Sequence, residues 1–273
     1  MDFTDEFCSI FRASKILIMI IVISPAKTLD YESPIGVHGS SDISFPEESK
    51  QLMRQLKKLS PKEISDLMKV SSKIAYLNHD RFAEWQWPFP AASTRQAIFA
   101  FKGEVYHGMD AYSLSQDETD FAQSHLRMLS GLYGVLRAYD RIMPYRLEMG
   151  IKLAYGKHKN LYQFWGNKIT KKLQSELDHQ QHKVLVNLAS NEYFKSVNMA
   201  KLKAEIITPV FKEARGDSYK TITMYAKKAR GMMCRFIIQN KIEDPEDLKL
   251  FDLEGYYYHE VLSTNNEFTF TRG

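Results

Sequence analysis

Leu-Ser-Gly-Leu-Tyr-Gly-Val-Leu-Arg-Ala-Tyr-Asp occupies residues Leu129 to Asp140, and its two glycines, Gly131 and Gly134, stand three positions apart. Apolar residues at helical spacing lead into this stretch, and four arginines flank it: Arg127, Arg137, Arg141 and Arg146. Glycine allows left-handed backbone angles and lets a ligand approach the main chain closely. The free N–H groups that begin a helix attract phosphate. The stretch therefore predicts a helix-hairpin-helix that binds a nucleic-acid backbone.

The glycine spacing leaves a second interpretation open. A typical helix-hairpin-helix turn places its glycines two positions apart, whereas Gly131 and Gly134 are three apart. A short motif of this kind is a hypothesis that depends on its structural context. A purely structural turn between two packed helices would use the same residues.

The composition is that of an ordinary soluble globular protein. Of the 273 residues, 44% are hydrophobic and 26% are charged, so the chain can bury a sizeable core. The apolar run at residues 16–23 is far shorter than the roughly 20 residues that cross a membrane. Acidic residues replace the basic leader of a signal peptide. We therefore expect a cytoplasmic protein with no membrane partner.

Cysteine and histidine usage gives no sign of a metal centre. Cys8 and Cys234 are the two cysteines, and they lie too far apart to match a metal-binding motif. The eight histidines also show no spacing typical of zinc or iron ligands. We therefore expect no metal site and no cofactor, in a reducing compartment.

The net charge of +4 is distributed unevenly along the chain. Between Lys195 and Arg235 there are ten Lys and Arg residues against three acids, whereas residues 236–273 hold three basic residues against eight acids. Such asymmetry favours one basic face for a polyanion and an acidic face that points elsewhere. Lysines are common on any protein surface, so a solvated face remains the alternative.

Strand and helix signals recur along the chain and predict its fold class. The short apolar runs at residues 20–23 and 184–190 are typical of buried strands, and Ser60 and Ser115 each open a capping box. No repeat or Pro/Gly linker divides the chain. We predict a single domain of α+β or mixed α/β class over residues 19–273, with a mixed β-sheet core surrounded by helices. Residues 1–18 are expected to be an extension, with Met19 a candidate natural start.

Polar residues follow two predicted strands and a third segment. In an open α/β sheet, ligands gather at the carboxyl ends of the strands. Candidates for such a cleft are Ser24, Lys27, Arg146, Glu148, Asn187, Ser190, Glu192 and Lys195. Among them Glu148 is a candidate general acid or base. Ordinary strand-ending turns use the same residue types, and no reaction follows from the set.

A second basic element lies at residues 225–235. Lys227, Lys228 and Arg230 fall on a predicted helix whose apolar side chains, such as Met232 and Met233, supply its core side. The basic residues cannot all point inward. The helix therefore presents either a solvated face or a surface that tracks phosphates.

Long strings of this sequence resemble the bacterial YaaA peroxide-stress family. They are Ile-Ser-Pro-Ala-Lys-Thr-Leu-Asp (23–30), Ala-Phe-Lys-Gly-Glu-Val-Tyr (100–106), Leu-Arg-Met-Leu-Ser-Gly-Leu-Tyr-Gly-Val-Leu-Arg (126–137), Pro-Tyr-Arg-Leu-Glu-Met-Gly (144–150), Asn-Leu-Ala-Ser-Asn-Glu-Tyr-Phe-Lys-Ser-Val (187–197) and Tyr-Ala-Lys-Lys-Ala-Arg-Gly (225–231). The resemblance extends from Met19 to the C-terminus.

The resemblance implies a cytoplasmic protein of the hydrogen-peroxide response that limits free intracellular iron. It also implies sequence-independent binding of duplex or branched DNA through a helix-hairpin-helix and a positively charged cleft. Mapped here, the hairpin falls on Ser130 to Arg137, and Ala138 stands where the family commonly has proline. We expect no obligate protein partner. The expected DNA contacts are Arg127, Ser130, Gly131, Gly134, Arg137, Arg141, Lys227, Lys228 and Arg230.

Two functions compete on this sequence. The first, which we favour, is a DNA-binding stress protein without catalysis. The second is an enzyme that acts on a nucleotide or nucleic acid in the polar cleft; convergence of Lys27, Glu148 and Glu192 in one pocket would favour it. A third, direct iron sequestration, would need a cluster of carboxylates and histidines. No catalytic residue is assigned.

Overall fold

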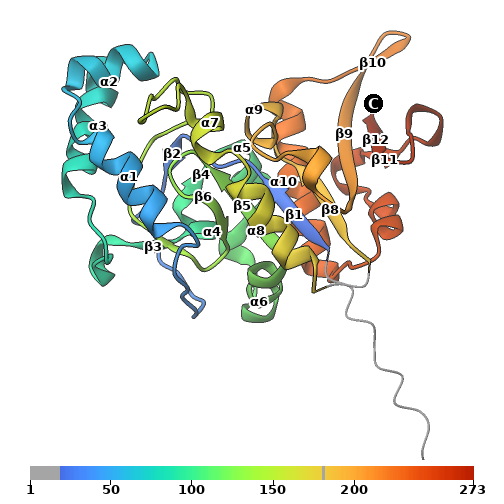
Figure 1. The fold of residues 1–273 in the computed structure, drawn as a ribbon. Helices are drawn as coiled ribbons and strands as arrows, with labels where there is room; N and C mark the ends of the chain where they lie inside the picture. The colour runs from blue at the N-terminus through green and yellow to red at the C-terminus, as the bar shows by residue number, and fades with distance from the viewer. Residues whose placement is uncertain (1–18, 180–181) are drawn as a thin grey trace, which may run out of the picture.

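The computed structural model describes residues 19–179 and 182–273, and its centre is a mixed β-sheet (Figure 1). In spatial order the strands are β11 (Tyr257–Tyr258), β12 (Glu267–Arg272), β9 (Glu205–Arg215), β8 (Val184–Leu188), β1 (Ile20–Ile23), β5 (Leu126–Ser130) and β6 (Gly134–Arg137). An eighth strand, β10 (Ser218–Lys220), pairs with β9. The predicted mixed α/β fold is confirmed, while the extension at residues 1–18 lies outside the described part of the chain.

Strand direction divides the sheet into a parallel centre and antiparallel margins. β5, β1, β8, β9 and β12 run parallel to their neighbours in this order. The pairs β5/β6, β9/β10 and β11/β12 are antiparallel. Two small ladders lie outside the sheet: β2 (Thr28–Leu29) with β4 (Phe101–Lys102), and β3 (Arg95–Gln96) with β7 (Arg141–Ile142).

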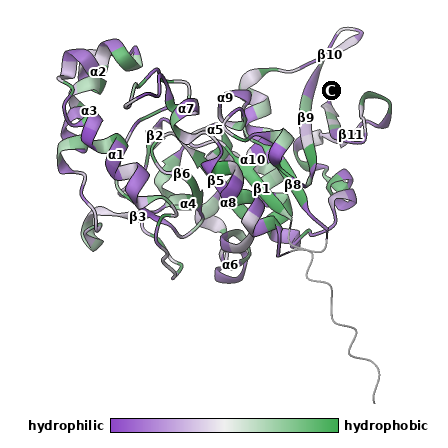
Figure 2. Ribbon diagram, in the orientation of Figure 1, coloured by the Kyte–Doolittle hydropathy of each residue, from purple (hydrophilic) through white to green (hydrophobic). Residues whose placement is uncertain are grey.

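Helices surround the sheet, with polar residues outward and the apolar strands inside (Figure 2). They are α1 (Pro46–Leu56), α2 (Pro61–Met68), α3 (Ser72–Glu84), α4 (Ala97–Ala100), α5 (Glu104–Met109), α6 (Gln116–His125), α7 (Leu161–Trp165), α8 (Lys168–Leu177), α9 (Asn191–Phe194) and α10 (Thr223–Asn240). Short 3₁₀ helices lie at Ala91–Ser93, Ala111–Ser113, Met199–Lys201, Pro245–Leu250, Leu253–Gly255 and Glu260–Leu262. In the described part of the chain, no helix is both long and apolar enough to cross a membrane.

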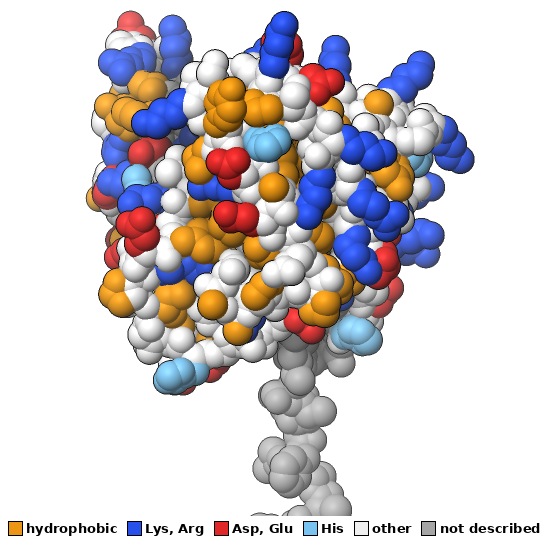
Figure 3. Space-filling view, turned by 90° about the vertical axis from the view of Figure 1, so that its left-hand side faces the viewer, with side chains coloured by type: hydrophobic (Ala, Val, Ile, Leu, Met, Phe, Trp, Pro, Cys, Tyr) orange, Lys and Arg blue, Asp and Glu red, His pale blue; other side chains and the backbone are white. Residues whose placement is uncertain are grey.

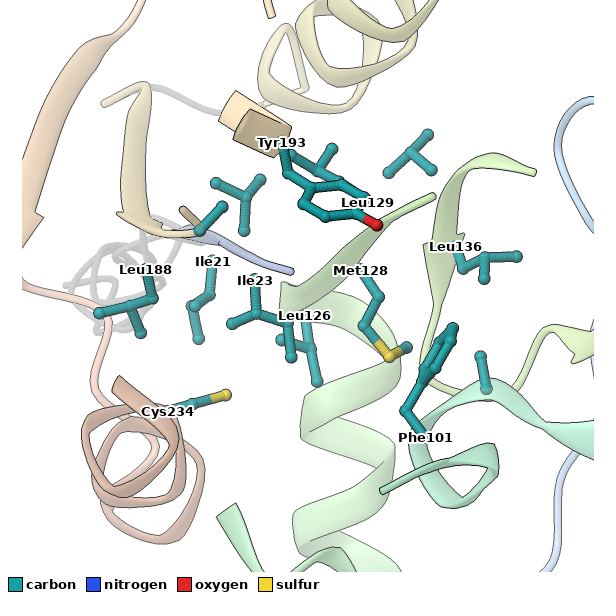
Figure 4. Packing of buried hydrophobic residues seen from close by; sticks show 14 of the residues in the cluster. Ile21, Ile23, Phe101, Leu126, Met128, Leu129, Leu136, Leu188, Tyr193 and Cys234 are labelled. Atoms are coloured by element: carbon teal, nitrogen blue, oxygen red, sulfur yellow. The ribbon is translucent and has the colours of Figure 1, made fainter. Parts of the chain in front are cut away.

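The core is built around β1, whose four residues are all buried. Ile21 lies opposite Leu126 of β5 and opposite Val186 of β8. In Figure 4, Tyr193 from α9 lies on one side of these strands and Cys234 from α10 on the other. Because a central parallel strand is covered on both faces, all of its residues are apolar, as residues 20–23 are.

Both predicted capping boxes are confirmed. The Ser60 backbone N–H donates to Glu63 Oε2 over 2.8 Å, and the Glu63 backbone N–H donates to Ser60 Oγ. The same reciprocal pair joins Ser115 and Glu118 at the start of α6. These bonds satisfy backbone donors that the first helical turn leaves unpaired, so local sequence fixes both helix starts.

The stretch 129–140 forms a β-hairpin, so the predicted helix-hairpin-helix is wrong. Helix α6 ends at His125, and Ser130 of β5 then pairs with Gly134 of β6. β5 joins the middle of the sheet beside β1, and all of its side chains are buried. A strand buried on both faces carries a continuous apolar run that helical spacing also fits, and here pairing with β1 decides the conformation.

Candidate functional site

A pocket of 590 Å³ lies at the carboxyl ends of β1 and β8. These strands are parallel neighbours, with β5 beyond β1 on one side and β9 beyond β8 on the other. The chain therefore leaves them in opposite directions, and such a switch point opens a crevice at the strand ends. Ser24 follows β1, and the Ser190 backbone N–H donates to Ser24 Oγ over 2.9 Å. This bond ties the two strand ends together at the pocket.

Most of the predicted cleft residues meet in this pocket. The ones that line it are Ser24, Lys27, Glu148, Ser190 and Glu192. Arg146 lies behind them: its Nη2 donates to Glu148 Oε1 over 2.8 Å, and Lys27 Nζ lies 3.4 Å from the same oxygen. One carboxylate oxygen thus sits between two cations at the pocket wall.

Two predicted cleft residues lie elsewhere. Asn187 is buried within β8, where its Oδ1 accepts from the Ala189 backbone N–H over 3.1 Å. Lys195 faces a separate groove, and its Nζ lies 5.4 Å from the centre of the Tyr162 ring. The Asn187 side chain holds the strand end together, and Lys195 covers an aromatic ring outside the pocket.

Glu148 owes its position to the hairpin turn. A Cβ at Gly131 would stand 2.2 Å from the Leu147 carbonyl oxygen, so only glycine lets the turn pack against this backbone. Glu148 itself is 8% exposed, and its Oε2 has no hydrogen-bond partner among the described residues. Next to it, the Gly150 backbone N–H donates to Glu192 Oε1 over 3.0 Å. The glycine turn therefore supports the pocket wall.

Four cationic side chains reach the pocket: Lys27, Lys102, Lys227 and Arg230. Lys227 and Arg230 stand three residues apart on α10, a spacing that places both on one helix face. Burial lowers the pKa of the Arg230 guanidinium. Within residues 19–179 and 182–273 this guanidinium has no hydrogen bond and no ion pair. It is a partly buried cation that no protein group neutralises.

Close contact between α5 and α10 sets the opposite wall. A Cβ at Gly231 would lie 1.8 Å from the Val105 carbonyl oxygen, and one at Gly108 would lie 2.1 Å from the Lys228 carbonyl oxygen. Glycine at both positions lets the two helix backbones touch. α5 also places Tyr106 at the pocket, where its hydroxyl donates to the Ser24 carbonyl over 3.1 Å and burial raises its pKa.

The remaining predicted DNA contacts lie away from the pocket. Ser130, Gly131 and Gly134 are buried, so the turn amides face the protein interior. The flanking arginines have partners: Arg127 with Glu176 at 2.7 Å, Arg137 with Asp140 at 3.0 Å, and Arg141 with Thr94 at 2.7 Å. Lys228 pairs with Glu254 at the protein surface.

Some pocket residues escaped the sequence-based prediction. Lys102, Glu104, Tyr106 and Tyr193 line the pocket but were not named as candidates. A usable signal was present at residues 102–104, where charged residues flank a glycine inside an otherwise apolar segment. Tyr193 has no such signal, because it stands next to Phe194, and two adjacent aromatic residues are typical of a hydrophobic core.

Charge is not gathered in one patch on the face that Figure 3 shows. Lys and Arg side chains stand along its upper edge and right-hand margin, with acidic and hydrophobic side chains between them. Across the described residues, no group of three or more His, Cys, Asp and Glu side chains could hold a metal ion. The arrangement of partners, more than the density of charge, distinguishes the pocket.

Comparison with known proteins gives a consistent family. A family model described as "Peroxide stress protein YaaA" matches residues 19–262. A UPF0246 protein of Aliivibrio fischeri strain MJ11 is 56% identical over 254 residues, which are 93% of this chain and 98% of that protein. A UPF0246 protein of A. fischeri strain ATCC 700601 / ES114 shows the same identity and coverage.

Proposed function

The chain belongs to the peroxide stress protein YaaA family, and from this premise we propose that it is a cytoplasmic DNA-binding protein that helps to limit free intracellular iron. It binds duplex DNA independently of sequence, at the opening of the pocket where β1 and β8 end, and needs no obligate protein partner. The observation that carries this proposal is the set of four cationic side chains at one pocket: Lys27, Lys102, Lys227 and Arg230.

Electrostatics supports this assignment. DNA affinity that ignores sequence comes from cations that neutralise phosphates and release counterions. Lys27 lies 3.4 Å from Glu148 and Lys102 lies 4.0 Å from Asp30, but these side chains are 66% and 56% exposed and can turn from such weak pairs to a phosphate. The pocket also holds the carboxylates of Glu104, Glu148 and Glu192, and Glu148 is paired more closely with Arg146, at 2.8 Å. Four cationic groups against three carboxylates leave the pocket with an excess of positive charge for a polyanion.

The test is duplex binding by fluorescence anisotropy across a salt series. The double variant Lys27→Gln/Lys102→Gln should bind about tenfold more weakly at low salt, with a log–log salt slope smaller by about two. The matched control is Lys62→Gln/Lys73→Gln, which removes the same charge from exposed positions on α2 and α3. Equal loss in both double variants would mean that total charge, and not this pocket, governs binding.

The iron part of the proposal has its own test. Cells that express the wild-type chain and cells that express Lys27→Gln/Lys102→Gln are challenged with peroxide, and free iron is measured by electron paramagnetic resonance. If iron is limited through DNA binding, free iron should rise in the variant cells and stay low with the Lys62→Gln/Lys73→Gln control. Equal free iron in the cells with the wild-type chain, the pocket variant and the control variant would show that the pocket does not control free iron.

One observation favours a second function, an enzyme that acts on a nucleotide or nucleic acid. Lys27, Glu148 and Glu192 meet in the same pocket, so a cation and two carboxylates could act together on a bound phosphate ester. End-labelled DNA incubated with the protein should then give a product on a gel, and Glu148→Gln should abolish that product while binding persists. If the wild-type protein leaves the DNA unaltered, the enzyme hypothesis is rejected and the non-catalytic DNA-binding function stands.

A further inference from the structure

We infer that the interior of the pocket takes one phosphorylated nucleoside unit, whose phosphate lies on the Arg230 guanidinium. The unit is either the end of a DNA strand or a free mononucleotide, since both present the same phosphomonoester on a nucleoside. This inference rests on the proposed function, because it names what the same pocket holds beyond its rim.

The first argument is the unneutralised charge of Arg230. Partial burial of a cation costs free energy unless an anion or a set of acceptors accompanies it. Arg127, Arg137 and Arg146 follow this rule, since each contacts a carboxylate. In the described residues, Arg230 and Arg81 of α3 are partly buried without a hydrogen bond or ion pair to the guanidinium, and of these two only Arg230 lines the pocket. An anionic ligand would supply the missing partner of Arg230.

The second argument is reach. Lys27 and Lys102 are exposed and can contact phosphates on the outside of a duplex. Arg230 is less accessible, because α10 is held against α5 by the glycine contact at Gly231. A duplex, whose major groove alone is about 12 Å wide, cannot enter a cavity of 590 Å³. A single nucleotide can, as in enzymes that draw one nucleotide out of a strand.

The third argument is the mixed character of the walls. Val105, which is partly exposed, lines the pocket together with Tyr106 and Tyr193, each of which keeps a small accessible area of 6% and 7%. These groups give a nucleoside apolar and aromatic atoms to contact. Glu104 and Glu192 also line the pocket and are more accessible than Glu148, and their carboxylates can accept from amino or hydroxyl donors of a nucleoside. Inorganic phosphate would use only the cations, so a nucleoside phosphate fits more of the pocket.

The experiment is calorimetric titration of the full chain with deoxyadenosine 5′-monophosphate, with deoxyadenosine and with inorganic phosphate. The monophosphate should bind at least about tenfold more tightly than either part. Arg230→Gln should weaken it about 10- to 100-fold, because a charge-assisted hydrogen bond to phosphate is lost. Lys228→Gln is the matched control on the same helix, since that lysine pairs with Glu254. Unchanged monophosphate binding by Arg230→Gln would overturn the phosphate assignment.

Three DNA probes then distinguish the source of the unit: a duplex with 5′-phosphates, the same duplex with 5′-hydroxyls, and a covalently closed circle. Preference for phosphorylated ends, lost in Arg230→Gln, supports a strand end. Equal binding of the three probes together with tight monophosphate binding supports the free mononucleotide. Equal binding of the three probes with no monophosphate binding overturns the inference but leaves the proposed DNA binding intact. The proposed DNA binding is tested separately, by the duplex affinity of Lys27→Gln/Lys102→Gln.

Discussion

The β5–β6 hairpin and helix α10 both place a glycine near basic residues, and in both the glycine touches the backbone of a neighbouring segment. In the hairpin, Gly131 packs against Leu147, and each flanking arginine has a protein partner. In α10, Gly231 packs against Val105, but Arg230 next to it has no partner among the described residues. A glycine next to arginines thus positions the pocket wall in the hairpin, and in α10 it accompanies a cation that is available to a ligand.

The difference teaches that partners decide the role of a basic residue. A carboxylate partner neutralises an arginine, so breaking the pair is costly and little charge remains for a phosphate. An unpaired arginine keeps its charge available to a bound anion. The hairpin contributes to the site indirectly, because its turn positions Glu148. The α10 residues contribute directly, because Lys227 and Arg230 line the pocket.

The largest expected effect concerns what the two regions share. Gly131→Ala and Gly231→Ala should each lower the free energy of unfolding by about 3 kcal/mol, with a fall in Tm of about 6 to 12 °C. The new Cβ would meet a backbone carbonyl that cannot move aside, at 2.2 Å and 1.8 Å. In α10 this outweighs the roughly 1 kcal/mol by which alanine is the better helix former.

Thermal unfolding by circular dichroism measures both variants. Gly36→Ala is the matched control, because nothing lies within 4 Å of its new Cβ. Its stability should change by no more than about 0.5 kcal/mol. If Gly131→Ala kept full stability and lost DNA binding instead, the turn would be a phosphate grip after all and the comparison would fail.

The second prediction separates the two arginines by the sign of their effect. Arg127→Met should destabilise the protein by about 2 kcal/mol, because it removes the buried guanidinium that donates to Glu176 over 2.7 Å and to the carbonyls of Gln123, Ser124 and Leu126. Arg230→Met should stabilise the ligand-free protein by about 1 kcal/mol, because it removes a partly buried charge without a partner. Urea unfolding followed by tryptophan fluorescence measures both values.

Binding should move in the other direction. Arg127→Met should keep its affinity for the nucleoside monophosphate once it is folded, and Arg230→Met should lose it. A loss of stability in Arg230→Met as large as that in Arg127→Met would reveal a structural partner for Arg230 and erase the contrast between hairpin and helix.

Local signals in the sequence predicted much of the fold. The capping boxes at Ser60 and Ser115 depend on residues three positions apart, and the run at residues 20–23 needs only its own hydrophobicity to be recognised as a buried strand. The hairpin was misassigned because α6 leads directly into β5. Helical spacing of apolar residues therefore continued past the true helix end at His125.

The site was predictable in its residues and not in its partners. Ser24, Lys27 and Ser190 were recognisable because each follows or ends a predicted strand, where an open sheet binds ligands, and Glu148 because it stands beside Arg146 in a polar segment. The partners of Arg127 and Lys228 lie 49 and 26 residues away along the chain, and no local pattern encodes such pairs. Which cations remain unpaired is therefore a property of the tertiary fold alone.

The smallest expected effect tests this within one helical turn, between the adjacent Lys227 and Lys228. Lys227 faces the pocket, whereas Lys228 turns to the surface and pairs with Glu254. The side chains of Lys228 and Glu254 are both more than 40% exposed. Lys227→Gln should weaken duplex binding a few-fold and reduce the salt slope by about one. Lys228→Gln should leave binding unchanged and cost no more than about 0.5 kcal/mol of stability, since exposed ion pairs contribute little.

Because both variants remove one charge from the same helix, total charge and long-range attraction are matched between them. Anisotropy over a salt series would therefore report only which lysine reaches the DNA, and equal slopes for the two variants would show that α10 acts as a diffuse basic surface rather than through its pocket face.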